Sequence, residues 1–296
     1  MRFGRPIRIA IWTAVAAQAC AAAVLLRCWA EAGADPVVVR YDVDMPGWAE
    51  DRPPRRIVLL SDTHVSGDAA ASRVDPERLR RVVERVNALG PDVVVLGGDY
   101  VSGHASRDNP VSFRDSVAPF AGLRSADGVY AVLGNHDYEL GDDAATLTAD
   151  LRAARVETLV NDQVDRGGFV LAGIDDLWFG RADTRMMGRL AQVGKPVVLV
   201  SHNPDVFPSV PGSVALTLSG HTHGAQIVPP LIGPIVSSSA FGQRYRYGRI
   251  VEDGHVLIVT SGIGGRPLRW NAPPEIVEIT IGRFPKARIG APAKKS

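Results

Sequence analysis

The sequence predicts an α/β fold in which two β-sheets pack face to face between helices. In the first half, short apolar strands alternate with helical patterns in a βα arrangement. In the second half, short apolar runs follow one another between Gly and Pro turns, which is typical of closely spaced strands. Several apolar runs end in clusters of Asp, His and Asn, and α/β proteins bind ligands at the carboxyl ends of their strands.

Length and charge narrow the class of protein. The chain has 296 residues and a formal net charge of +1. This length suits one catalytic α/β domain with an N-terminal appendage. Because the charge is nearly balanced, there is no global electrostatic case for nucleic acid, and we expect no nucleic-acid partner. The oligomeric state stays open.

Residues 1–32 have the layout of a signal anchor or a signal peptide. The segment from Ile9 to Leu26 has 18 residues and no charge, and it follows Arg2, Arg5 and Arg8. Ala30-Glu31-Ala32 offers a small-x-small cleavage site, but we favour an uncleaved anchor, with export of the chain as the alternative. The positive-inside rule places everything after the apolar segment on the extracytoplasmic side of the membrane.

The rest of the chain divides into three parts. Residues 33–55 are expected to form an edge strand, Val37 to Val43, and a Pro-rich linker. The catalytic domain is expected to span residues 56–282, and residues 283–296 form a polar tail.

Within the domain, each element follows from a local pattern. Asp75-Pro76 opens a helix whose apolar residues share one face and which ends near Gly90-Pro91. A second helix covers Ala144 to Ala154. Buried strands are predicted at Ile57 to Leu60, Asp92 to Leu96, Val129 to Leu133, Phe169 to Ala172, Pro196 to Val200, Val214 to Leu218, Val256 to Thr260 and Ile276 to Ile281.

The polar clusters at the strand ends carry metal-binding side chains. Asp62 and His64 are two residues apart, so in an extended segment they point to the same side, and His221 and His223 share this spacing. Asp99 follows Gly97-Gly98, where a flexible backbone lets one carboxylate bridge two metal ions. Further polar side chains at strand ends are Asn135, His136 and His202.

The distribution of histidine strengthens this interpretation. Five of the seven histidines lie in the strand-end clusters, and only His104 and His255, to which we assign no role, lie elsewhere. Both cysteines, Cys20 and Cys28, belong to the N-terminal segment, so the ligands must be oxygen and nitrogen atoms. Such a ligand set suits Mn, Fe or Zn ions, and the sequence does not rank them.

In their order along the chain, these motifs resemble the calcineurin-like metallophosphoesterase superfamily. The motifs are Asp62-x-His64, Gly98-Asp99, Gly134-Asn135-His136-Asp137, His202 and Gly220-His221-x-His223. The resemblance covers roughly residues 56–280 and implies a four-layer αββα sandwich of two mixed sheets with a binuclear metal centre between the sheet ends.

The resemblance also implies a role for each site residue. One metal ion would be held by Asp62, His64, Asp99 and His223, and the other by Asp99, Asn135, His202 and His221. His136 would be a catalytic donor to the phosphate or leaving group rather than a ligand. Asp137 would orient its neighbours. The metal ions would polarise the phosphoryl oxygens and supply hydroxide at neutral pH.

Within the superfamily, the N-terminal segment and the closing segment from Gly262 to Glu275 resemble the bacterial membrane-associated branch of phosphodiesterases. The expected function is therefore hydrolysis of a phosphate diester, including a lipid-linked one, at the bacterial cell membrane. The alternatives are a phosphomonoesterase or protein phosphatase, a UDP-diacylglucosamine pyrophosphatase-like hydrolase, and an inactive metal-binding scaffold. The pyrophosphatase reaction is cytoplasmic and conflicts with the orientation expected here.

The segment from Ser237 to Arg249 is a candidate pocket wall. Pro229-Pro230 and Gly233-Pro234 predict an irregular loop before it, and such loops often border a site at the end of a sheet. We expect Arg244 and Tyr245 to bind substrate, since they offer charge to a phosphate and an apolar surface to a head group. The alternative is an ordinary amphipathic hairpin.

Overall fold

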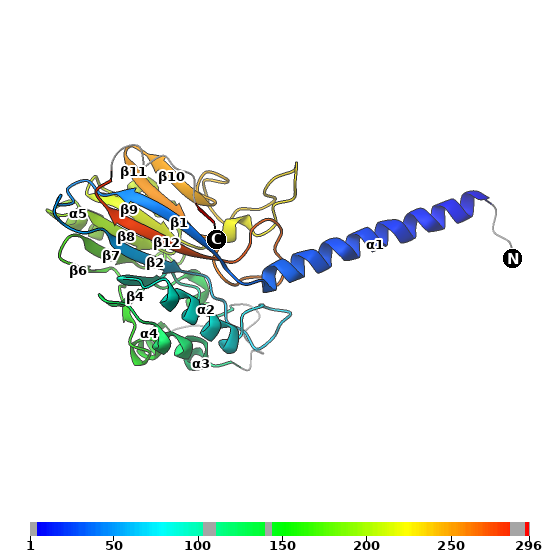
Figure 1. The fold of residues 1–296 in the computed structure, drawn as a ribbon, viewed down its shortest axis with the longest axis horizontal. Helices are drawn as coiled ribbons and strands as arrows, with labels where there is room; N and C mark the ends of the chain where they lie inside the picture. The colour runs from blue at the N-terminus through cyan, green and yellow to red at the C-terminus, as the bar shows by residue number, and fades with distance from the viewer. Residues whose placement is uncertain (1–4, 103–110, 140–143, 285–293, 296) are drawn as a thin grey trace.

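A computed structural model describes residues 5–102, 111–139, 144–284 and 294–295 of the chain. His104 lies outside the described residues. A long helix, α1 (Arg5–Gly33), projects from a folded domain that contains every other element (Figure 1). The predicted strands and helices are confirmed, with bounds that agree within about two residues.

Two mixed sheets form the centre of the domain. The first has the order β13 (Lys294–Lys295), β1 (Val37–Asp44), β12 (Glu275–Gly282), β2 (Arg55–Leu60), β3 (Val93–Leu96), β4 (Val129–Ala131) and β5 (Glu157–Thr158). The second has the order β10 (Gly248–Glu252), β11 (His255–Val259), β9 (Val214–Ser219), β8 (Val197–Ser201), β7 (Val170–Ile174) and β6 (Asp162–Asp165). In the first sheet β2 to β5 run parallel, and in the second β7, β8, β9 and β11 do.

Successive side chains of a strand point to opposite faces of its sheet, so each sheet packs on the other sheet with one face and on helices with the other. In β2, Ile57 and Leu59 pack between the two sheets, whereas Val58 and Leu60 pack on the opposite face against helices. That face is covered by α2 (Pro76–Ala88), α3 (Phe113–Val117), η2 (Ala118–Gly122) and α4 (Ala144–Ala153). The outer face of the second sheet is covered by α5 (Arg185–Leu190) and η4 (Pro204–Ser209). The expected four-layer αββα sandwich is confirmed.

The residues before and at the first turn of helix α2 explain why the helix begins at Pro76. The side chain of Asp75 accepts a hydrogen bond from the backbone N–H of Arg78 at 2.7 Å, and Pro76 occupies the first turn. Leu79, Val83 and their neighbours on the same face are buried against the first sheet. The helix thereby supports the strands that carry the polar clusters.

Strand β1 differs from the expected edge strand and linker. It pairs in parallel with β12 along its whole length, and Val39 and Arg40 also pair with β13. A strand with neighbours on both sides belongs to the sheet, so a division at residue 56 does not separate it from the domain. The sequence did not reveal this because β12, its main partner, lies more than 200 residues away in the chain.

Candidate metal centre

The polar clusters meet where the carboxyl ends of the two sheets approach each other. Asp62 and His64 follow β2, and Asp99 follows β3, in the first sheet. His202 follows β8, and His221 follows β9, in the second sheet. Backbone hydrogen bonds join the first two ends, because the N–H of His64 donates to the carbonyl of Asp99 at 3.0 Å. The site is therefore built from the inner strands of both sheets.

The backbone carries the candidate ligands in an uncommon conformation. Among the described residues, five of the side chains predicted to bind metal have positive φ angles, namely Asp62 (54°), His64 (42°), Asp99 (55°), His221 (68°) and His223 (50°). Left-handed φ is uncommon for residues other than glycine, and such strain concentrates at functional sites. The fold therefore stabilises a local conformation that aims these side chains inward.

Two glycines allow the strand ends to approach closely. Gly98 has a φ of 94°, and a Cβ there would lie 2.6 Å from the backbone nitrogen of Gly134. A Cβ at Gly220 would collide with the side chains of Asp62 and Ser61. Because neither position has room for a side chain, glycine is required for the two sheets to share one site.

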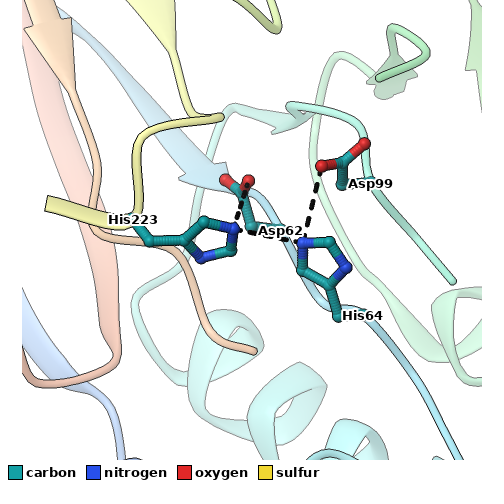
Figure 2. A group of neighbouring side chains, drawn as sticks. All are labelled: Asp62, His64, Asp99 and His223. Carbon is teal, nitrogen blue, oxygen red and sulfur yellow. Dashed lines mark hydrogen bonds and ion pairs between the residues drawn. The ribbon is translucent and has the colours of Figure 1, made fainter. Parts of the chain in front are cut away.

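The first group of side chains contains Asp62, His64, Asp99 and His223 (Figure 2). His64 Nε2 lies 3.4 Å from Asp99 Oδ2, and His223 Nε2 lies 3.5 Å from Asp62 Oδ1. The two imidazoles also face each other, with 3.2 Å between their Nε2 atoms. Two carboxylates and two imidazole nitrogens thus converge on one small volume, which is a ligand set for a divalent cation.

The second group contains Asp99, His202 and His221. His202 Nε2 lies 3.1 Å from Asp99 Oδ2 and 3.3 Å from His221 Nδ1. Asp99 Oδ2 is therefore the atom that the two groups share, since His64 Nε2 lies 3.4 Å from the same oxygen. One carboxylate placed between two sets of ligands is the arrangement that a binuclear centre requires.

Hydrogen bonds to backbone carbonyls determine which ring nitrogen of His202 and of His221 faces the site. His202 Nδ1 lies 2.7 Å from the carbonyl oxygen of Gly97, so its Nε2 faces Asp99. His221 Nε2 lies 3.3 Å from the carbonyl oxygen of Ser238, so its Nδ1 faces the site. Backbone carbonyls that accept from the outer nitrogen orient metal-binding imidazoles in this way.

Burial keeps three of the imidazoles neutral, as metal ligation requires. Burial lowers the pKa of His64 to about 3, although the charge of Asp99 opposes this shift. Burial likewise lowers the pKa of His221 to about 4. Burial and the positive charge of Arg269 lower the pKa of His223 well below its usual value.

Asp99 and His202 shift each other's pKa in opposite directions. Burial disfavours the charged imidazole, but the charge of Asp99 and its hydrogen bond outweigh this effect and raise the pKa of His202 to about 10. Burial likewise opposes ionisation of Asp99, and His202 reverses it, so the pKa of Asp99 lies well below its usual value. A buried carboxylate that gathers positive charge in this way suits a cation-binding role.

One buried polar atom supports the fit to metal ions. In the part of the chain that the structure describes, Asn135 Oδ1 is buried and has no hydrogen-bond partner. Buried polar atoms are nearly always paired, so an unpaired amide oxygen beside these clusters is consistent with a ligand that binds there. Asn135 itself is buried in the short helix η3 (Asn135–Asp137) that follows β4.

His136 lies at the rim of the site rather than among the converging ligands. Its side chain is 27% exposed, and its ring meets that of His64 edge-on, with 4.9 Å between the centroids. Its Nδ1 lies 3.1 Å from Glu139 Oε2, a carboxylate that sequence reasoning did not single out. Its backbone N–H donates to Asp99 Oδ1 at 2.9 Å. The imidazole is thus partly exposed, and the backbone that carries it is bonded to the carboxylate of Asp99.

Asp137 organises the loop beneath the site. Its carboxylate accepts backbone N–H hydrogen bonds from Asp99, Tyr100 and Gly134, at 2.9, 2.9 and 2.8 Å. Burial and the charge of Asp99 raise the pKa of Asp137 to about 7. These contacts give the carboxylate the orienting position that its place in the motif implied.

Arg269, which was not assigned a role from the sequence, stabilises the backbone next to the site. It is 1% exposed, and its guanidinium donates to the carbonyl oxygens of Ser261, Gly264 and Ala272. The backbone N–H of Gly264 in turn donates to the carbonyl oxygen of Asp62 at 2.7 Å. Buried arginines have no sequence signature of their own, because only the fold shows which carbonyls surround them.

The predicted substrate-binding residues, Arg244 and Tyr245, have other contacts in the structure. Tyr245 is fully buried among Phe207, Leu257 and Val259, so it presents no surface to a substrate. Arg244 forms a two-point ion pair with Glu252, with distances of 2.7 and 2.8 Å. The expectation for Tyr245 is wrong, because an amphipathic pattern does not reveal which aromatic side chain turns inward.

A different aromatic residue stands at the rim. The ring of Trp178 meets that of His221 edge-on, with 4.8 Å between the centroids, and Trp178 is 60% exposed. Phe179 beside it is 49% exposed and packs near Tyr138. Both belong to the loop after β7, whose sequence contains no metal-binding motif that would mark it as part of the site.

Comparison with known proteins settles the family. Residues 55–225 match the family model described as calcineurin-like phosphoesterase. This chain belongs to the calcineurin-like phosphoesterase family. The resemblance read from the motifs is thereby confirmed, and a metal-binding phosphoesterase domain accounts for the clustered Asp and His side chains.

Several curated relatives share this family. The chain is 30% identical over 270 residues to a "Transmembrane protein with metallophosphoesterase domain" of Danio rerio, which covers 83% of this chain and 57% of the relative. It is 32% identical over 237 residues to an uncharacterized metallophosphoesterase of Helicobacter pylori strain J99, which covers 76% of this chain and 59% of the relative. The chain thus spans less than two thirds of the length of these relatives.

Two further comparisons concern a shorter relative and a solved structure. The uncharacterized metallophosphoesterase YkuE of Bacillus subtilis is 30% identical over 240 residues, which cover 76% of this chain and 78% of the relative. A crystal structure of a dimetal phosphatase from Danio rerio superposes with a TM-score of 0.45 at 16% identity, covering 72% of this chain and 88% of that one.

Proposed function

We propose that this chain is a membrane-anchored, two-metal phosphoesterase that hydrolyses phosphate diesters. The observation that carries the proposal is the position of Asp99 Oδ2 between His64 Nε2, at 3.4 Å, and His202 Nε2, at 3.1 Å. One cation would be held by Asp62, His64, Asp99 and His223, and the other by Asp99, Asn135, His202 and His221. When bound, Mn, Fe or Zn ions polarise the phosphoryl group and supply a nucleophile at neutral pH.

The chain's own side chains hold the substrate and move a proton. His136 is exposed at the rim, so its imidazole can contact the phosphoryl group or donate a proton to the departing oxygen. Glu139 Oε2 lies 3.1 Å from His136 Nδ1, and an ion pair between them would leave Nε2 available for this donation. Asp137 keeps Asp99 in place through the backbone.

The rim favours a diester over a monoester. Additional cationic side chains would stabilise a monoester dianion, but two arginines of the candidate loop have other partners, since Arg244 is paired with Glu252 and Arg246 donates to the carbonyl oxygen of Gly224. Trp178 instead offers an exposed aromatic face beside His221, which suits the second substituent of a diester.

Helix α1 supports the proposed membrane anchor. Its segment Arg8–Gly33 is long and apolar enough to cross a membrane, with a mean hydropathy of 2.0, and it makes no buried contact in that apolar window. Its last turns enter the domain, because Cys28 and Ala32 are buried and Glu31 accepts the backbone N–H of Ala272 at 3.0 Å. A helix that is continuous through residues 30–32 and packed into the domain argues against cleavage there.

Paired activity measurements test the proposed reaction. With Mn²⁺ added, the full chain should hydrolyse bis-p-nitrophenyl phosphate with a higher kcat/KM than p-nitrophenyl phosphate. A higher kcat/KM for the monoester would favour the phosphatase alternative. Bound metal without activity on either compound would favour the inactive scaffold.

A further inference from the structure

An uncharged, exposed loop follows the last two candidate ligands. Residues 224–243 contain no Asp, Glu, Lys, Arg or His, although 22% of the chain is charged. The tip of this loop carries four apolar side chains with exposed fractions of 108% for Leu231, 76% for Ile232, 62% for Ile235 and 67% for Val236. So many large apolar side chains gathered on one exposed loop mark an interaction surface. We call residues 229–236 the apolar loop.

The base of the apolar loop is attached to the end of α1 by hydrogen bonds. The N–H of Val228 donates to the carbonyl oxygen of Trp270, and Asn271 Nδ2 donates to the carbonyl oxygen of Val228, both at 2.9 Å. Arg27 in α1 donates to Asn271 Oδ1 at 3.1 Å, and its guanidinium lies 5.8 Å from the Trp270 ring centroid. The segment around Trp270 therefore joins the loop to the helix.

The position of Arg27 indicates how deep the contact between α1 and the base of the apolar loop would lie in a membrane. The 18 residues from Ile9 to Leu26 form about 27 Å of helix, close to the roughly 30 Å hydrocarbon thickness of a bilayer. Arg27 and the exposed Trp29 come directly after this segment, and Arg and Trp side chains occupy the headgroup region. Asn271, which Arg27 contacts, then lies at headgroup level, and so does the base of the apolar loop.

The direction of the loop agrees with this placement. Figure 1 shows the yellow-gold loop that follows β9 projecting from the side of the domain from which α1 leaves. Residues 228–247 form turns and bends rather than a helix or strand. Irregular backbone is not tolerated in the hydrocarbon centre but can lie at the interface, where water and headgroups satisfy it.

We propose that the apolar loop inserts into the interface of the bilayer that α1 spans and is a second membrane contact of the domain. This inference rests on the proposed anchor and deepens the proposed function. The chain on both sides of the loop leads to the metal centre, because His223 lies six residues before it and the carbonyl oxygen of Ser238, two residues after it, lies 3.3 Å from His221 Nε2. The centre is thereby held at the lipid surface, which points to an amphiphilic diester as the substrate class.

Photocrosslinking from the full chain tests the contact without reference to activity. We would compare Ile232→p-benzoylphenylalanine with Val251→p-benzoylphenylalanine, since Val251 is an exposed apolar residue of β10, 56% accessible, outside the loop. Both proteins are reconstituted in vesicles of phosphatidylethanolamine and phosphatidylglycerol, illuminated and analysed by intact mass. The proposal predicts a lipid adduct from position 232 and little or none from position 251.

Three outcomes would overturn the proposal. They are no adduct from position 232, equal lipid adducts from both positions, and an adduct from position 232 to a second copy of the chain. The last result would identify the apolar loop as a surface for self-association. None of these results depends on whether the metal centre is active.

A kinetic comparison tests the consequence for substrate. Leu231→Ser/Ile232→Ser should lower kcat/KM about tenfold or more for a nitrophenyl phosphodiester that carries a long acyl chain and is presented in the same vesicles. Hydrolysis of soluble bis-p-nitrophenyl phosphate should stay unchanged, and Val251→Ser should affect neither substrate. Equal losses on both substrates would reject the link between the loop and an amphiphilic diester. Absence of activity in the native chain would instead count against the proposed function.

Discussion

The carboxylate of Asp137 accepts a hydrogen bond from the backbone N–H of Asp99 at 2.9 Å. Asp99 has a φ of 55°, a conformation that a non-glycine residue keeps only when its surroundings enforce it. Asp137 also binds the N–H groups of Tyr100 and Gly134, so it connects the end of β3 to the end of β4. The bridging carboxylate therefore depends on a neighbour that touches no proposed cation.

The first prediction concerns this dependence. In Asp137→Asn, the amide NH₂ replaces one acceptor oxygen and leaves a backbone N–H unpaired, which should lower the free energy of unfolding by about 1.5–3 kcal/mol. Metal affinity should also fall, since Asp99 loses part of its support. Thermal unfolding and metal titration would measure the two effects. An Asp137→Asn protein with native stability and native metal affinity would show that the hydrogen bonds do not position Asp99.

The second prediction separates proton donation from ligation. His136→Ala should retain the metal ions, because the imidazole stands at the rim, while kcat falls by roughly 10²- to 10⁴-fold. His255→Ala is the matched control, since that ring lies at the start of β11 and its Nδ1 is 2.6 Å from the carbonyl oxygen of Val214. Loss of a metal ion from His136→Ala, or an unchanged kcat, would remove the proposed role.

The third prediction concerns the rim. Trp178→Ala should raise KM for bis-p-nitrophenyl phosphate by roughly three- to tenfold, the range expected for one aromatic contact. Arg244→Ala should leave KM unchanged, because its guanidinium pairs with Glu252 on the surface. If Arg244→Ala raised KM and Trp178→Ala did not, the result would favour Arg244 over Trp178 as the residue that binds the substrate.

The fourth prediction concerns topology. Because basic residues precede the apolar segment of α1, a reporter that is active only in the periplasm should be active when fused after Ser296. The N-terminal sequence of the mature protein should begin before residue 30, since α1 continues into the domain without a break. A reporter active only in the cytoplasm would reverse the orientation and restore the UDP-diacylglucosamine reaction as a candidate.

The sequence predicted the fold and the candidate ligands because both depend on short-range patterns. Each strand that carries a cluster is largely apolar, and the polar residues come within a few positions of its end, as Asp99 does after Val93–Leu96. Strands with weaker patterns were missed. The strand β6, Asp162–Asp165, is largely exposed at the sheet edge and contains one apolar residue, so no buried run marks it.

Features that depend on long-range packing could not be predicted. The inward turn of Tyr245 follows from its packing on Phe207, which lies in η4 nearly 40 residues earlier. The contact between Trp178 and His221 joins two loops of the second sheet. The attachment of α1 to the segment around Trp270 joins residues more than 240 positions apart in the chain. None of these pairs has a local sequence signature.

Metal content measured together with activity tests the central claim most directly. The full chain purified with Mn²⁺ should contain two metal ions per chain by elemental analysis, and chelation should abolish hydrolysis of bis-p-nitrophenyl phosphate until Mn²⁺ is restored. Asp99→Asn should lose most of the metal and nearly all of the activity, because both ligand groups share Asp99 Oδ2. Two metal ions retained by Asp99→Asn, or hydrolysis by the native chain that survives complete metal removal, would contradict the account.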